Sequence, residues 1–447
     1  MNRVLFLLVA LLNATSIFSQ SEVLKPPIQF ESFKEVLQYA DENAIAIKGA
    51  VINEQIANSG QKEAHAYLYP SINASAGYNN NLTIQPTLVP SEFFNPSAPS
   101  GSFEELTFGQ QHLTSAGVQV QWDILNFKKI FASQTAKVVA NQSEVNTQRS
   151  KFNTYNLLAS TYYSIVLSQE SIKIYEENIR ISDSIYANTK EKFQKGILSD
   201  AELNAAEIKQ LQNRRKLNLA EGNLSRFNNQ LRSQLNTKEQ IAITDTPQSF
   251  ILENANLQTS HPEIAWQETE VRKYASLLKQ KKSLLLPSLS FGHQYNVNWA
   301  SDRFMDFSNS NYLPQQAIGA KLSIPLFNGF SSRQKIKQSK LELSYQQFKL
   351  ENTKLLMQNE DEQLLLDLKN SLQDLSDNTE ILKLMKENDI HSKNKYESGI
   401  ISLNERLDMY EDLLTAQDNY LQSLASFTLT QYKVYIRQID FNSNNLK

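Results

Sequence analysis

The sequence predicts a mainly α-helical protein with a small β part, in which one plan of long-helix hairpins occurs twice. Two observations predict this fold class. The stretch FQKGILSDAE at residues 193–202 returns as YESGIISLNE at residues 396–405. Residues 127–195 contain neither Gly nor Pro, and as one helix they would extend on the order of 100 Å.

Each copy of the repeated stretch predicts the end of one helix and the immediate start of the next. An aromatic residue is followed three positions later by Gly196 or Gly399, and glycine tolerates the left-handed conformation at a helix C-terminus. Ser-x-x-Glu follows, which is the pattern of a capping box. We therefore expect a tight helical hairpin with its tip at each glycine.

The two glycines lie 399 − 196 = 203 residues apart in a chain of 447 residues, so the plan takes up about half of the sequence. We expect the first repeat at residues 20–245 and the second at residues 246–447. Residues 1–19, with Arg3, an apolar run at 4–12 and small residues after it, predict a secretory signal peptide. The apolar run is too short to span a bilayer as a helix.

Four stretches alternate polar with apolar residues, which is typical of half-buried β-strands. They lie at about 71–85 and 114–125 in the first repeat, and at about 288–299 and 317–327 in the second. The Pro-rich segment from residue 86 to about residue 112 predicts an irregular loop.

The composition excludes several classes of function. The chain has no cysteine, which excludes disulfides, thiolate metal sites and thiol catalysis. Its net charge of −3 argues against binding to nucleic acid. Phosphate-binding glycine loops, nucleophile elbows and histidine–acid groupings do not occur in the sequence. The sequence therefore predicts a protein that is not an enzyme and needs no cofactor or metal ion.

The strands, at about ten residues each, are long enough to cross an outer membrane. Four strands cannot close a barrel, however, and lipid does not tolerate open sheet edges. If the strands lie in a bilayer, the chain must therefore oligomerise. Three copies would supply a 12-stranded transmembrane β-barrel, continuous with a periplasmic α-helical barrel. Heptad spacing of Leu341, Phe348 and Leu355 predicts helix neighbours for the second long helix.

The sequence resembles the TolC family of outer-membrane efflux proteins. The resemblance rests on the duplicated plan, the SHPEI helix start at residues 260–264, the YPS joint at 69–71, the IPLFNG joint at 324–329 and the two Gly-x-x-Ser-x-x-Glu hairpins. It implies a homotrimeric channel-tunnel in the outer membrane that extends into the periplasm. Such a tunnel works with a periplasmic adaptor (membrane fusion) protein and an inner-membrane efflux pump or ABC exporter, in drug, metal-ion or protein export.

The resemblance also implies roles for residues of the hairpins. Acids six and nine positions after the second glycine ring the closed entrance; these are Glu405 and Asp408. A latch between neighbouring hairpins would join Tyr396 and Glu202. The family's basic residue two positions after the second glycine is replaced by Ile401. The tips that would dock with the adaptor are Gly196, Ile197, Leu198, Ser199, Gly399, Ile400, Ile401 and Ser402.

Each of these assignments has a structural alternative. The capping boxes alone explain Glu202 and Glu405, and Tyr396 fits an apolar contact beside a helix end equally well. Asp408 has no capping role, which makes it the preferred entrance acid, with an ordinary solvated Asp as the alternative. For the whole protein, the alternative is an exported coiled-coil scaffold or adhesin without channel activity, whose four strands would form a soluble sheet.

Overall fold

The computed structural model describes residues 26–246, 256–258 and 260–441, so the predicted signal peptide at 1–19 lies outside the described residues. The chain divides into two compact units. Unit 1 comprises the described parts of residues 1–49, 148–261 and 358–447, and unit 2 comprises residues 50–147 and 262–357. Each unit takes elements from both predicted repeats, and the division into repeats at residue 245 remains a prediction.

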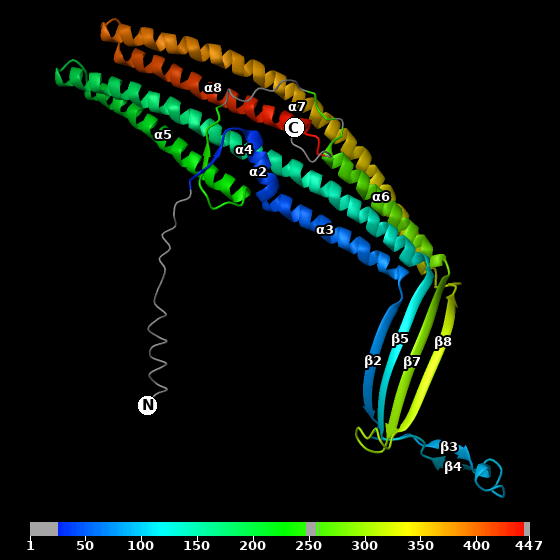
Figure 1. Ribbon diagram of the computed structural model, residues 1–447. Helices are drawn as coiled ribbons and strands as arrows, with labels where there is room; N and C mark the ends of the chain where they lie inside the picture. The colour runs from blue at the N-terminus through cyan, green and yellow to red at the C-terminus, as the bar shows by residue number, and fades with distance from the viewer. Residues whose placement is uncertain (1–25, 247–255, 259, 442–447) are drawn as a thin grey trace, which may run out of the picture. The chain divides into compact units, whose positions relative to one another are not determined.

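Unit 2 contains a four-stranded antiparallel sheet (Figure 1). Its strands are β2 (Ser71–Asn80), β5 (His112–Asn126), β7 (Ser288–Ser301) and β8 (Asn311–Ser323), in the order β2-β5-β7-β8. Ser71 pairs with Gln121, and Gly292 pairs with Gly319. A bulge interrupts the pairing of β5 with β7 between Trp122 and Leu125. Strands β2 and β8 form the two edges.

The strands differ from the sequence prediction at their ends. β8 begins six residues earlier than expected. Pro314, which the sequence analysis placed in the preceding loop, lies inside β8 opposite Val297. Proline lacks the N–H of a central strand, but an edge strand tolerates it. The segment expected to be an irregular loop contains a short hairpin of β3 (Thr87–Pro90) and β4 (Phe103–Leu106), joined through the 3₁₀ turn η2 (Ser91–Phe93).

The helices of unit 2 lead into the sheet. They are α6 (Pro262–Lys282), most of α3 (Ile45–His65), and the first parts of α4 (Phe127–Gln194) and α7 (Ser331–Glu397). The 3₁₀ turns η1 (Ala66–Leu68) and η3 (Ser283–Leu285) precede β2 and β7. Polar side chains join α4 to its neighbours: Thr135 lies 2.8 Å from Ser276, and Thr147 donates to Glu54 at 3.0 Å.

Unit 1 contains the two hairpin ends. Its elements are α2 (Phe33–Asn43), α5 (Asp200–Gln234), α8 (Leu403–Gln438) and the second parts of α4 and α7. The short strands β1 (Ile28–Phe30) and β6 (Ile241–Ile243) pair in parallel. Among the described residues, no helix is both long and apolar enough to cross a membrane.

An aromatic core holds α2 against α4 and α8 in unit 1. The ring of Phe33 lies 5.2 Å from that of Tyr162 and 4.7 Å from that of Tyr432. The Tyr162 hydroxyl donates to Asp245 at 2.8 Å, so its polar atom is satisfied inside the core. Burial, together with this bond, raises the pKa of Tyr162 well above its usual value. The Tyr162 hydroxyl therefore keeps its proton inside the core.

Two adjacent leucines of α4 test this core. Leu158 is fully buried, whereas Leu157 is 53 % exposed. We expect Leu158→Ala to lower the free energy of unfolding by about 2–5 kcal/mol, because it leaves a cavity. Leu157→Ala is expected to cost less than about 1 kcal/mol. Thermal or denaturant unfolding of the two variants measures the difference, and equal losses would contradict the placement of α4 in the core.

Candidate functional site

The two hairpin ends have the same backbone geometry. At the first end, Gly196 has φ of 72° and its N–H donates to the carbonyl of Phe193 at 2.8 Å. At the second, Gly399 also has φ of 72° and donates to the carbonyl of Tyr396 at 3.1 Å. The left-handed conformation suits glycine and strains other residues. The predicted helix stops are therefore present at both glycines.

The helix starts after the glycines have complete capping boxes, as the Ser-x-x-Glu pattern predicts. The Ser199 N–H donates to the Glu202 carboxylate at 2.8 Å, and the Ser199 Oγ accepts from the Glu202 N–H at 3.4 Å. Ser402 and Glu405 repeat these bonds at 3.1 and 3.2 Å. Hydrogen bonds from the Ser199 backbone and hydroxyl hold the pKa of Glu202 below its usual value. The carboxylate of each Glu thus serves its own helix.

The predicted latch partners are not bonded to each other within the chain. The Glu202 carboxylate accepts from Ser199, whereas Tyr396 is buried beneath Lys192, whose Nζ lies 3.9 Å from the ring centroid. The Tyr396 hydroxyl has no hydrogen-bond partner among the described residues. Tyr396 therefore contacts Lys192 of the first hairpin in its own chain, and a latch to another chain remains a prediction.

The predicted entrance acids lie on the first turns of α8. Glu405 and Asp408 are both exposed and one turn apart on the same face. Glu405 is engaged by Ser402, as described above, and Asp408 forms no ion pair with a described residue. Asp408 is therefore the acid that is free to act on a solute, and its role remains a prediction.

The tips present apolar side chains. Ile197 and Ile400, at equivalent positions, are 65 % and 71 % exposed. Leu198 and Ile401 instead pack against the apolar cluster beneath the tips. Within the described part of the chain, no three His, Asp or Glu side chains are grouped closely enough to hold a metal ion.

A buried ion pair that the sequence analysis missed lies behind the second tip. Arg406 donates to Asp389 at 2.6 Å and to Ser392 Oγ at 3.0 Å, and its side chain is only 2 % exposed. Arg406 occupies an apolar-face position of α8, between the buried Leu403 and Leu407. A basic residue at such a position was the signal that could have revealed the pair. It joins α8 to α7 directly.

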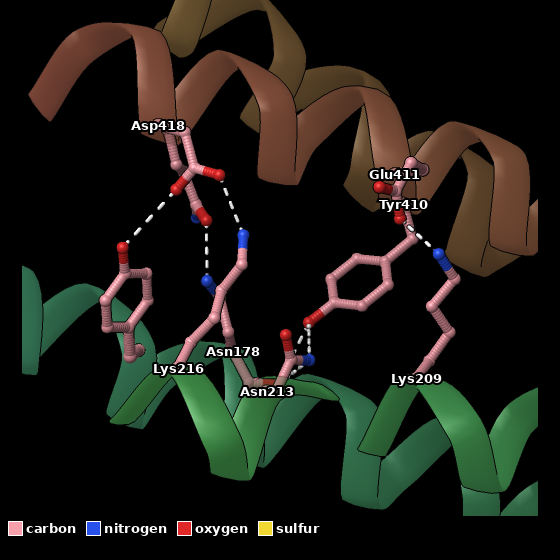
Figure 2. Close-up of polar contacts among 9 residues, drawn as sticks. Asn178, Lys209, Asn213, Lys216, Tyr410, Glu411 and Asp418 are labelled. Atoms are coloured by element: carbon pink, nitrogen blue, oxygen red, sulfur yellow. Dashed lines mark hydrogen bonds and ion pairs between the residues drawn. The ribbon is translucent and has the colours of Figure 1, made fainter. Parts of the chain in front are cut away.

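Polar side chains also join α8 to the first hairpin (Figure 2). The Tyr410 hydroxyl donates to the carbonyl of Asn178 at 2.9 Å and accepts from Asn213 at 2.9 Å, and all three residues are buried. Asn178 also donates to Gln417 at 2.7 Å. Burial raises the pKa of Tyr410 above its usual value. The hydroxyl therefore keeps its proton and its donor role.

Two ion pairs, seven residues apart on each helix, flank these buried contacts. Lys209 of α5 pairs with Glu411 of α8, and Lys216 pairs with Asp418 at 2.7 Å. Tyr175 of α4 adds a 3.4 Å bond to Asp418. Burial, followed by the charge of Asp418, raises the pKa of Tyr175 to about 12. These polar contacts join the two hairpins in addition to the apolar cluster beneath the tips, which contains residues of both.

The Arg406–Asp389 pair can be tested by comparing single and double substitutions. Arg406→Met leaves a buried, unpaired carboxylate, and we expect it to lower the free energy of unfolding by about 3–5 kcal/mol. Adding Asp389→Leu should restore most of this loss, because an apolar pair of similar volume replaces the ion pair. Denaturant unfolding measures both effects.

The control for this comparison is Arg214→Met, which removes an exposed ion pair with Asp183. We expect a loss of about 1 kcal/mol or less, because water screens the pair. If the double variant is no more stable than Arg406→Met, the loss in Arg406→Met does not come from an unpaired Asp389 carboxylate.

Known proteins with the same plan of long-helix hairpins and a small sheet are similar to this chain. Residues 36–237 match the family model described as outer membrane efflux protein. Among solved structures, the CmeC outer membrane channel of Campylobacter jejuni is 19 % identical, with a TM-score of 0.68 over 91 % of this chain and 84 % of that one. The outer membrane protein VceC of Vibrio cholerae is 12 % identical, with a TM-score of 0.69 over 92 % and 96 %.

The open-state MtrE outer membrane channel of Neisseria gonorrhoeae is 13 % identical, with a TM-score of 0.65 over 91 % of this chain and 88 % of that one. No protein of curated function matches the sequence. At these identities the likeness to solved structures shows the fold, and it confirms the predicted class of long-helix hairpins with a small sheet.

Proposed function

Because the chain belongs to the TolC-like outer membrane efflux proteins, we propose that it is the outer-membrane channel-tunnel of a tripartite efflux or type I secretion system. It conducts substrates passively from an inner-membrane pump or ABC exporter, through a periplasmic adaptor, to the outside. The family and the solved neighbours are channel proteins, and the energy for transport comes from the pump. The channel extends from the outer membrane into the periplasm.

The observation that carries this proposal is the two-edged sheet of unit 2. Strands β2 and β8 are each paired on one side only, and both expose apolar side chains, with Ile72 at 68 % and Ile318 at 72 %. Lipid cannot satisfy the backbone groups of a free edge. Pairing of β8 with β2 of the next chain in a homotrimer removes every edge and gives a twelve-stranded barrel.

Exposed apolar rows on the helices support assembly in both units. On α7 in unit 2, Leu341, Phe348 and Leu355 follow heptad spacing and are each more than half exposed. In unit 1, Ile208 and Leu211 of α5 are likewise more than half exposed. Contiguous apolar surface of this kind marks an interface. Neighbouring copies would cover these rows and form the helical barrel.

The hairpins form the periplasmic entrance in this proposal. Three copies of Asp408, with Glu405 one turn before it, make an acidic ring, and a latch between chains uses Tyr396 and Glu202. The exposed Ile197 and Ile400 fit the role of apolar contacts for the adaptor at the tips. Opening requires the second hairpin to move away from its neighbour.

Single-channel conductance of the purified protein in planar bilayers tests the function. We expect a particle of three chains in detergent that forms small, cation-selective channels blocked by a few millimolar divalent cation. Asp408→Asn should weaken this block severalfold, because it removes one charge per chain from the ring.

The matched control is Asp374→Asn, an exposed acid in the middle of α7, which should leave the block unchanged. If no channel forms and the protein stays in solution without detergent, an exported coiled-coil scaffold or adhesin replaces the proposed channel. Normal channels with unaltered block in Asp408→Asn would remove Asp408 from the entrance.

A further inference from the structure

The two faces of the four-stranded sheet differ sharply in polarity. Side chains of directly paired residues share a face, so the register assigns each of them. One face carries Ile72, Val120, Phe291, Tyr295, Ile318 and Leu322, with His293 and Gln316 as a hydrogen-bonded polar pair among them. The opposite face carries Asn73, Gln119, Gln121, Gln294, Asn296 and Gln315. In a membrane channel the first face contacts lipid and the second contacts water.

Lys321 lies on the polar face, two residues before the end of β8. It pairs with Ser290, and its neighbour Gly319 pairs with Gly292. Around these two glycines the surface is hollowed to a volume of about 460 Å³. A side chain added at Gly319 would meet no atom within 4 Å. The floor of this hollow is therefore bare backbone.

Hydrogen-bonding side chains surround that floor. The residues that line the hollow include Gln119, Gln121, Gln294 and Lys321. The amides can donate to an anionic group, and the ammonium supplies the charge that attracts it. A carboxylate, phosphate or sulfate group would find both kinds of partner here.

The positive charge of Lys321 is not balanced by a free acid on the four strands of this sheet. The one acid on these four strands is Asp123 of β5, which forms its own ion pair with Lys129 at 2.6 Å. Lys321 forms no ion pair with a described residue, and its side chain is exposed. The polar face of the sheet therefore carries a net positive charge at the level of Lys321.

We propose that Lys321 forms an anion-binding ring inside the strand-lined part of the channel. Three copies would place three ammonium groups at one level, each beside a glycine-floored hollow lined by amides. A ring of like charge concentrates counter-ions in a narrow pore. This inference rests on the proposed trimeric channel, and it gives the strand section the opposite charge preference to the acidic entrance.

The first experiment tests which side of the strand Lys321 faces. Because the chain contains no cysteine, Lys321→Cys provides one thiol per chain and no other thiol in the trimer. We expect this thiol to react with a membrane-impermeant methanethiosulfonate reagent that carries a sulfonate group, since a water-facing thiol ionises readily. Ile318→Cys, on the apolar face, is the matched control and should react at least about tenfold more slowly. Equal reaction rates would overturn the assignment of the faces.

The second experiment measures charge selection in planar bilayers with a salt gradient. The background is Asp408→Asn, so that the acidic entrance does not dominate the reversal potential. We expect Lys321→Gln to raise the cation-to-anion permeability ratio about twofold, and Lys321→Glu to raise it further. Citrate should be added on the side of the loops that join β2 to β5 and β7 to β8. It should reduce the current through channels with Lys321 and leave the current through the Lys321→Gln channel unchanged.

The outcomes separate this inference from the proposed function. Trimeric channels whose reversal potential and citrate response are the same with Lys, Gln and Glu at position 321 would overturn the anion ring and leave the channel intact. Absence of any channel in the wild-type protein would overturn the proposed function itself. A graded shift from Lys to Gln to Glu, with normal trimers, supports the ring.

Discussion

Backbone hydrogen bonding at the edges of a four-stranded sheet is the constraint on which the rest of this protein depends. Each outer strand has donors and acceptors on its free side that a membrane leaves unsatisfied. One chain cannot remove its own edges with four strands. In the proposed membrane channel the sheet therefore requires copies of itself, and the exposed apolar rows of α5 and α7 would be covered in that assembly. In the proposed barrel, the alternation of side chains along each strand places the apolar face toward lipid and the polar face toward the channel.

The hairpin ends were predictable because their chemistry is local. Gly399, Ser402 and Glu405 lie within seven residues, and each residue type has one conformational or capping preference that the structure satisfies. The strands were predictable for a similar reason, since a period of two is visible in a short stretch. The ends of β8 were less so, because tolerance of Pro314 depends on whether a strand lies at an edge, and this is a property of the sheet order.

The contacts between the hairpins could not be read from the sequence. Asn178 and Gln417 lie 239 positions apart, and nothing near either residue indicates the other. Arg406 gave a local signal, a charge at an apolar position, but its partner depends on how α7 and α8 are aligned. Pairing of this kind follows from the packing of whole helices. The proposed entrance acid Asp408, which forms no ion pair with a described residue, leaves still less trace in local patterns.

The buried ion pair behind the second tip has a mechanical consequence. Because Arg406 ties α8 to α7 within the first turn and a half of α8, we expect the two helices to move together at that end. A force applied at the tip would then displace α7 and α8 together. Separation from the first hairpin would break the polar contacts, where water can replace each lost hydrogen bond, and would also expose the apolar cluster beneath the tips.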